Sequence, residues 1–173
     1  MLLYFYYLKR LMSIDISPPK EKAQKAYPEN KQLFERLKRK KPKNLDDTFH
    51  ALHEEVFEQI ECLDCANCCK TTSPIFYERD IERLAKFLKI RPSEFIEKYL
   101  HIDEDNDYVL NVAPCPFLDS ENYCTVYEAR PTACREYPHT DRKRMVQILD
   151  LTLKNIEICP AVFWIVERMK ERY

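Results

Sequence analysis

Cys62-Leu63-Asp64-Cys65-Ala66-Asn67-Cys68-Cys69 is the stretch around which the chain is organised. It holds four of the eight cysteines in the pattern C-x2-C-x2-C-C, and two residues between cysteines is a spacing that directs successive thiolates at one metal centre. The remaining cysteines follow at Cys115, Cys124, Cys134 and Cys159. We therefore expect the chain from residue 62 onward to fold back on a thiolate-rich centre.

Composition excludes several classes of protein. The 173 residues carry a formal net charge of −1 and include no glycine. A charge near zero gives no general attraction to nucleic acid or anionic membranes, and no apolar run reaches the roughly 18 residues of a membrane span. Without glycine there is no G-x-G-x-x-G, no P-loop and no G-x-S-x-G elbow, so the usual nucleotide-binding and α/β-hydrolase chemistries are excluded.

The cysteine count has two interpretations. In a secreted protein, eight cysteines would form four disulfides. Residues 1–8 are apolar, but Lys9 and Arg10 follow this run rather than precede it, and no small-residue cleavage site comes after it. We therefore expect a cytoplasmic protein, in which clustered cysteines bind metal or serve redox chemistry. Met12 is an alternative start, in which case residues 1–11 do not belong to the natural protein.

Apolar periodicity predicts a helical protein. Helices are expected over residues 29–41, 45–61, 78–89, 92–101 and 160–172, and short strands over 75–76, 108–112 and 144–153. Residues 13–28, with Ser17-Pro18-Pro19 and several lysines, are typical of a linker. The expected fold is mainly α with a few short strands, a small α+β protein whose helices wrap around an irregular cysteine-rich metal-binding core. We expect an arm and basic helix over 1–44 and the metal-binding domain over 45–173.

Three polar features have ordinary interpretations. Asn44 precedes the apolar period of 45–61 and is a plausible N-cap. The basic run 38–43 suits the C-terminal end of a solvated helix, so no nucleic-acid partner is expected. His50 and His53 have no cysteine nearby in the sequence, and we interpret them as surface histidines rather than metal ligands.

The later cysteines lie in motifs of their own. Cys115-Pro116-Phe117-Leu118 is followed by Cys124-Thr125-Val126-Tyr127-Glu128-Ala129-Arg130-Pro131-Thr132-Ala133-Cys134-Arg135-Glu136-Tyr137-Pro138 and then by Cys159-Pro160. Together with residues 62–69, these motifs resemble the CxxCxxCC, or YkgJ-type, cysteine-cluster family, which is described as chelating zinc or iron. The family commonly has glycine after the second cysteine, where this chain has Ala66, a difference that bears on the loop backbone and not on the ligands. Some flagellin lysine methylases carry a similar cluster.

All eight cysteines are candidate metal ligands: Cys62, Cys65, Cys68, Cys69, Cys115, Cys124, Cys134 and Cys159. The first three have the spacing of a ferredoxin run, whose fourth cysteine lies elsewhere and precedes proline. Two of the later cysteines precede proline, and either can complete such a site. Adjacent side chains diverge, so Cys68 and Cys69 do not easily bind one small ion. Eight thiolates suffice for two four-coordinate sites, and Cys69 belongs to the second site if there are two rather than one. The alternative is that one or two cysteines are simply buried.

The metal is an iron–sulfur cluster or Zn²⁺. Structural zinc sites usually pair two C-x2-C knuckles, and the second knuckle is missing here, which favours iron–sulfur. Four thiolates around either centre leave a net charge of −2. Arg130, Arg135 and Lys70 lie beside cysteines in the sequence, and we expect them to offset this charge or donate hydrogen bonds to sulfur.

Three functions are consistent with these motifs. The first is a metal-binding protein with an iron–sulfur cluster or zinc, used in redox chemistry or in support of a modifying enzyme. The second is a structural zinc module that binds a protein partner, with Phe117, Trp164 or the N-terminal arm as candidate contacts. The third is a relative of the lysine methylases, which is least supported because there is no glycine loop to bind a cofactor. No catalytic residue is identified, and the sequence names no substrate.

Overall fold

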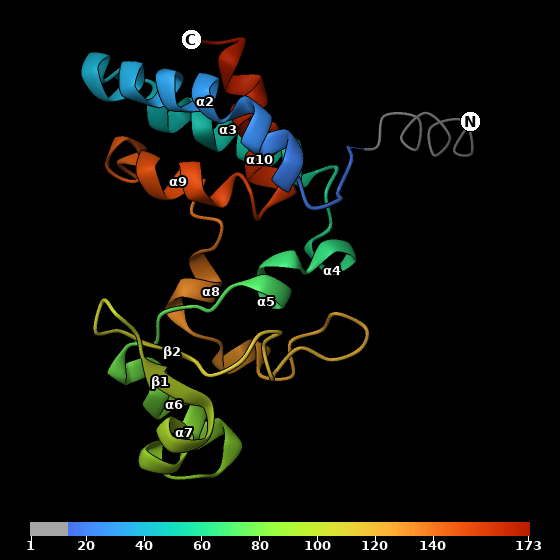
Figure 1. Ribbon diagram of the computed structural model, residues 1–173, viewed down its shortest axis with the longest axis vertical. Helices are drawn as coiled ribbons and strands as arrows, with labels where there is room; N and C mark the ends of the chain where they lie inside the picture. The colour runs from blue at the N-terminus through green and yellow to red at the C-terminus, as the bar shows by residue number, and fades with distance from the viewer. Residues whose placement is uncertain (1–13) are drawn as a thin grey trace, which may run out of the picture. The chain divides into compact units, whose positions relative to one another are not determined.

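The computed structural model describes residues 14–173. The apolar arm over 1–12 and the alternative start at Met12 lie outside the described residues. The described chain forms two compact units, which are coloured by residue number in Figure 1. The terminal unit contains residues 14–65 and 138–173, and the central unit contains residues 66–137. Compactness alone does not test the division that we expected at residue 45.

The terminal unit is a bundle of helices. Its elements are α2 (Lys20–Lys40), α3 (Leu45–Phe57), α4 (Cys62–Cys65), the 3₁₀ turn η2 (Met145–Gln147), α9 (Leu149–Asn155) and α10 (Pro160–Lys170). Helix α3 packs along α10, and α2 packs against α9 and α10 (Figure 1). Apolar residues spaced three or four apart form its core, among them Phe49, Leu52 and Val56 of α3 and Ile165 and Met169 of α10. This spacing places them on one face of each helix.

The linker expected over residues 13–28 is wrong, whereas Asn44 is the N-cap residue of α3 as expected. Residues 20–28 are helical rather than linker, and Pro28 lies inside α2. Ala23 is buried in the core of the terminal unit, so packing of the helix face outweighs the unfavourable proline. Asn44 occupies the N-cap position of α3, but its side chain makes no capping hydrogen bond. Its Oδ1 instead accepts from the Tyr173 hydroxyl at 3.4 Å.

The strand expected over residues 144–153 is also wrong, because the segment forms η2 and α9. The alternation of Val146 and Ile148 suggested a strand, yet the buried residues are Met145, Leu149 and Thr152, which follow a helical period. The Asp46 carboxylate of α3 accepts from the backbone N–H groups of residues 144 and 145, at 2.6 and 2.9 Å. These two bonds fix the start of the turn on α3.

The central unit combines short helices with a two-stranded sheet. Its elements are α5 (Asn67–Thr71), α6 (Glu78–Leu88), α7 (Pro92–Tyr99), β1 (Leu100–Ile102), β2 (Tyr108–Leu110), the 3₁₀ turn η1 (Tyr127–Ala129) and α8 (Thr132–Glu136). The strands pair antiparallel with Leu100 opposite Leu110, so residues 100–101 are strand and not the end of the expected helix. Phe95 and Leu84, both 0% exposed, lie at the centre of its core.

The molecule is therefore mainly α with a small sheet, as expected for the fold class. Over residues 14–173, no helix is both long and apolar enough to cross a membrane.

Several turns use the left-handed backbone conformation without glycine. The residues with positive φ are Lys41, Ala66, Lys89, Asn106, Asn122, His139 and Arg144. For most side chains this conformation costs about 1–2 kcal/mol, because the Cβ atom approaches the carbonyl oxygen. Ala66, with φ 48°, occupies the position after the second cysteine of the cluster, so the loop there requires the conformation that glycine adopts most easily.

Candidate metal centre

The eight cysteines divide between the two units. Cys62, Cys65 and Cys159 belong to the terminal unit, and Cys68, Cys69, Cys115, Cys124 and Cys134 belong to the central unit. None forms a disulfide, Cys62 is exposed, and the other seven are partly buried. Each unit therefore contains at least three cysteine thiols.

Backbone contacts bring four cysteines of the central unit into one neighbourhood. The Cys115 amide donates to the Cys69 carbonyl at 2.8 Å, and Leu118, three residues on, pairs with Cys124 in an antiparallel bridge. Cys134 interacts electrostatically with all three of the others. We call Cys69, Cys115, Cys124 and Cys134 the central thiol set. In the same unit, the Cys68 sulfur lies 4.0 Å from the Cys69 sulfur.

Three cysteines of the terminal unit form a second group. Cys159 is the N-cap residue of α10 and packs against the helical core. It interacts electrostatically with Cys62 and Cys65, which form the two ends of α4. We call these three residues the terminal thiol set.

Backbone amides point at the sulfurs of three of these cysteines. The Cys115 sulfur accepts from the N–H groups of Phe117 and Leu118, and the Cys124 sulfur accepts from that of Val126. The Cys159 sulfur accepts from the first-turn N–H groups of residues 161 and 162. Such bonds favour the thiolate over the thiol, and they orient the sulfur before a metal binds.

Burial opposes this effect and keeps most of the thiols protonated. It raises the pKa of Cys134 and that of Cys159 to about 12. It also raises the pKa of Cys115 and that of Cys124 above the ordinary value, despite the amide donors. Cys69 is different, because the hydrogen bond from Cys68 lowers its pKa to about 7. A metal that binds the central thiol set at neutral pH must therefore displace protons.

The three basic residues that were expected around the metal centre make different contacts. The Arg130 guanidinium lies over the Tyr127 ring, 3.6 Å from its centroid, and its charge acts to lower the pKa of Cys124 and of Cys134. Arg135 donates to two backbone carbonyls, of Arg130 at 3.1 Å and of Glu128 at 3.0 Å. The charge of Lys70 acts to lower the pKa of Cys69.

Comparison with known proteins adds the family. A model of the CxxCxxCC family, whose description is "Putative zinc- or iron-chelating domain", matches residues 61–159, more than half of the chain. The chain belongs to the CxxCxxCC family. Chelation of zinc or iron is thus the function that membership supports. No curated protein and no solved structure matches the chain. The redox, modifying-enzyme and methylase roles remain hypotheses, because the family description names no reaction.

The thiols of this CxxCxxCC protein fit the family's metals in chemistry, because thiolates are preferred ligands of both zinc and iron–sulfur clusters. Over residues 14–173, no three His, Cys, Asp or Glu side chains are gathered closely enough to hold one ion.

The two histidines of α3 have hydrogen-bond partners within the terminal unit. His50 Nε2 lies 2.9 Å from the Arg142 carbonyl oxygen, and His53 Nδ1 lies 2.8 Å from the Thr140 hydroxyl.

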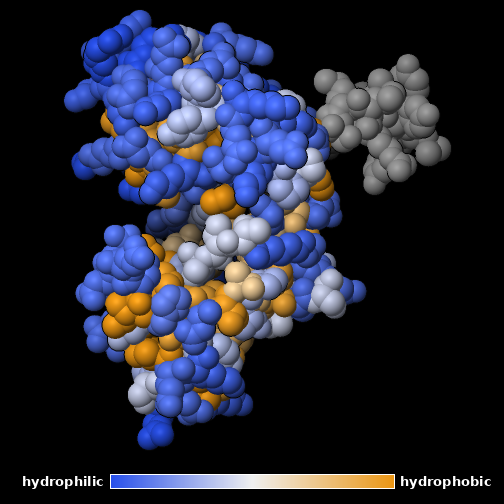
Figure 2. Space-filling view, viewed as in Figure 1, coloured by the Kyte–Doolittle hydropathy of each residue, from blue (hydrophilic) through white to orange (hydrophobic). Residues whose placement is uncertain are grey.

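The described side chains that were expected to bind a protein partner instead pack within the CxxCxxCC protein itself. Phe117 is 7% exposed and stacks on Phe95, so the expected contact at Phe117 is wrong. The Trp164 indole N–H donates to the Asp15 carbonyl, and its ring packs against the terminal core. Figure 2 shows other apolar side chains on the drawn face of the central unit. Phe87, in α6 of that unit, is 48% exposed.

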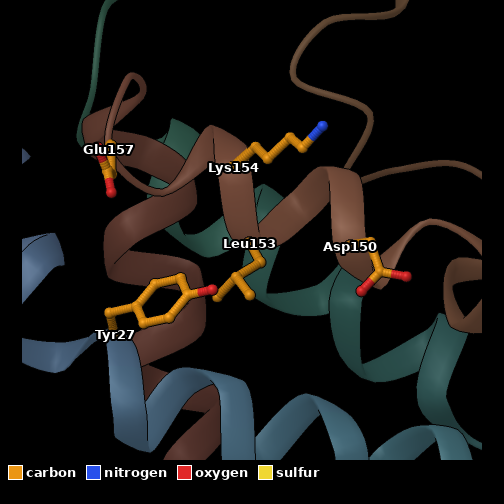
Figure 3. A pocket seen from close by; sticks show the side chains of 5 residues that line it. All are labelled: Tyr27, Asp150, Leu153, Lys154 and Glu157. Carbon is orange, nitrogen blue, oxygen red and sulfur yellow. The ribbon is translucent and has the colours of Figure 1, made fainter.

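A surface cavity of about 350 Å³ lies in the terminal unit of the CxxCxxCC protein, between α2 and α9. It is lined by Tyr27, Asp150, Leu153, Lys154 and Glu157. In Figure 3 the Tyr27 ring extends toward Leu153, and the Lys154 side chain points away from this pair. No cysteine lines the cavity, and Asp150 is paired with Lys38 at 2.6 Å, so the cavity is separate from both thiol sets.

Proposed function

We propose that this CxxCxxCC protein chelates iron or zinc through thiolates of both units. The central thiol set supplies four ligands, Cys69, Cys115, Cys124 and Cys134. The terminal thiol set supplies three, Cys62, Cys65 and Cys159. Cys68 follows Cys65 at the spacing of a ferredoxin run, and the metal content of the Cys68→Ser protein tests whether it is a ligand.

The observation that carries this proposal is the set of amide donors at the sulfurs. Cys115 and Cys159 each precede proline, and each sulfur accepts from the amides two and three residues ahead. A buried neutral thiol gains little from two such donors, whereas a metal-bound thiolate gains a charge-assisted bond from each. The backbone is thus arranged for a charged sulfur in surroundings that otherwise disfavour charge.

An iron–sulfur cluster is the form that we favour. A cysteine followed by proline closes ferredoxin-type runs, and hydrogen bonds to sulfur tune the potential of such clusters. When bound, a cluster supplies one-electron chemistry, whereas Zn²⁺ held by four thiolates supplies structural stability and no redox chemistry. The chain's own part in either case is to hold the sulfurs, to neutralise charge through Arg130 and Lys70, and to release the thiol protons. The side chains must also move closer together than the structure places them.

Anaerobic purification followed by metal and sulfide analysis tests this function. Iron with equimolar acid-labile sulfide and broad visible absorption supports the cluster, and colourless protein with stoichiometric zinc supports the alternative. Cys134→Ser is expected to remove the metal of the central set, and Cys159→Ser that of the terminal set. If both variants keep the full wild-type metal content, the proposal is wrong. In the Cys68→Ser protein, metal loss supports the ferredoxin-like run.

A further inference from the structure

The central unit contains a buried carboxylate that the metal proposal does not use. Asp80, in the first turn of α6, is 0% exposed. Its Oδ1 accepts from the Arg83 guanidinium at 2.6 Å, from the Thr132 hydroxyl at 3.0 Å and from the Thr132 amide at 3.2 Å. Its Oδ2 accepts from the Tyr77 amide at 3.3 Å, which caps α6. One carboxylate thus joins the start of α6 to the start of α8.

The Arg83 side chain extends the same connection. Besides its pair with Asp80, it donates from Nε to the Ala129 carbonyl at 3.2 Å and from Nη2 to the Arg130 carbonyl at 2.8 Å. Arg135 binds the Arg130 carbonyl from α8. The turn before α8 is therefore held by two guanidinium groups and a carboxylate. Ala129 in this turn is 3% exposed and packs into the core of the central unit.

The segment that Asp80 and Arg83 hold in place begins at Cys124 and contains Cys134, and both cysteines belong to the central thiol set. Cys134 lies two residues after Thr132 in α8, and Cys124 precedes η1, where its carbonyl accepts from the Tyr127 amide at 3.1 Å. A short helix of five residues cannot hold its own place, because its few internal bonds do not repay the cost of nucleation. Its position must come from tertiary contacts, and Asp80 with Arg83 supplies them.

We propose that Asp80 and Arg83 are positioning residues of the metal centre, which hold the segment from Cys124 to Cys134 so that both sulfurs can reach the same metal. This inference rests on the proposed function of the central thiol set. Partners behind the ligands typically change metal affinity by about 10- to 100-fold when they are removed. The Asp80 network is expected to have an effect of this size, although none of its atoms contacts a thiol in the hydrogen bonds described above.

Cobalt substitution in the full-length chain tests the inference. Sulfur-to-cobalt charge-transfer absorption per bound Co²⁺ reports the number of thiolate ligands, which a loss of general stability does not change. At saturating Co²⁺, which loads the weakened central set, Cys134→Ser first sets the charge-transfer intensity that is lost with one thiolate ligand. Thr132→Val removes the hydroxyl donor at similar volume, and it is expected to weaken Co²⁺ binding about 10-fold and reduce the charge-transfer intensity toward that of Cys134→Ser. Thr132→Ser keeps both donors and is expected to restore both values.

Asp80→Asn keeps an acceptor but loses the charge, and it is expected to weaken binding by about 10- to 100-fold. Asp103→Asn is the matched control, because Asp103 also accepts two backbone N–H groups, of Asp105 and Asp107, in a turn of the same unit that carries no cysteine. Wild-type affinity and intensity in both Asp80→Asn and Thr132→Val would overturn the positioning role while leaving the metal proposal intact. If Cys134→Ser itself matches the wild type, the proposed function fails first.

Discussion

The pH dependence of metal binding is the most quantitative consequence of the central thiol set. At pH 7 the thiols of Cys115, Cys124 and Cys134 are protonated, because burial raises the pKa of each above its ordinary value. Cys69, whose pKa the hydrogen bond from Cys68 lowers to about 7, is partly ionised. Binding one divalent ion to four thiolates therefore releases between about three and four protons at pH 7.

The sign follows from competition. Protons and metal bind the same sulfurs, so the metal affinity rises with pH, by about 1,000- to 10,000-fold per pH unit near pH 7, and the slope falls to about three protons once Cys69 is deprotonated. We expect this for Zn²⁺ in the Cys62→Ser/Cys159→Ser protein, in which the central set remains. Competition with a chromophoric chelator between about pH 6.5 and 8 gives the slope.

Calorimetry in buffers of different ionisation enthalpy counts the released protons independently. In the same background, Cys69→Ser serves as the control, since it removes the thiol whose pKa the hydrogen bond from Cys68 lowers to about 7 and should eliminate the change of slope. A slope of one proton or less in the parent protein would refute the reasoning, because it would mean that the buried thiols are not the ligands or are already ionised before the metal arrives.

Three further predictions concern stability. Phe49→Ala is expected to cost about 3–5 kcal/mol in urea unfolding followed by Trp164 fluorescence, since Phe49 is 0% exposed in the terminal core; a cost below about 1 kcal/mol would contradict this packing. Burial acts to raise the pKa of Asp80, but hydrogen bonds from Arg83 and Thr132 hold this pKa below its ordinary value. The stability that the Asp80 carboxylate contributes is therefore present above about pH 4 and is lost as pH falls through its folded-state pKa. An Asp80→Asn protein whose acid unfolding matches that of the wild type would argue against this contribution. Chelation is expected to speed hydrogen exchange over 66–137 while the fluorescence of Trp164 stays native, because the terminal unit has its own helical core; simultaneous loss of both signals would contradict this.

The strongly periodic helices could be predicted from the sequence. Residues 78–89 were expected to be helical and the structure has α6 at Glu78–Leu88, because four apolar residues at helical spacing leave few alternatives. The segment 144–153 could not be predicted. Its local alternation favours a strand, whereas the contact that fixes the turn comes from Asp46, 98 residues away for the closer of its two amide donors.

The candidate site divides in the same way. The spacing of the cysteines identified them as candidate ligands, but which sulfurs are neighbours depends on loops that no local pattern describes. Asp80 was missed because an acidic residue in a first turn is ordinary in sequence. Its partner Thr132 lies 52 residues further along the chain. The backbone of the cysteine loop did leave a signal in the sequence. The family commonly has glycine at the position of Ala66, and the backbone there is left-handed.

The absence of glycine also affects the unfolded chain. Average usage would give about a dozen glycines in 173 residues. Each glycine would raise the conformational entropy of the unfolded chain, which favours unfolding by about 0.5–1 kcal/mol relative to alanine. A chain in which every residue has a Cβ atom thus begins folding from a narrower ensemble. The cost reappears at the seven left-handed positions of residues 14–173, where a glycine would relieve about 1 kcal/mol of strain in the folded state while broadening the unfolded ensemble. At those seven positions the two effects nearly cancel, and a mutational scan with glycine would therefore identify them as the tolerant sites of the fold.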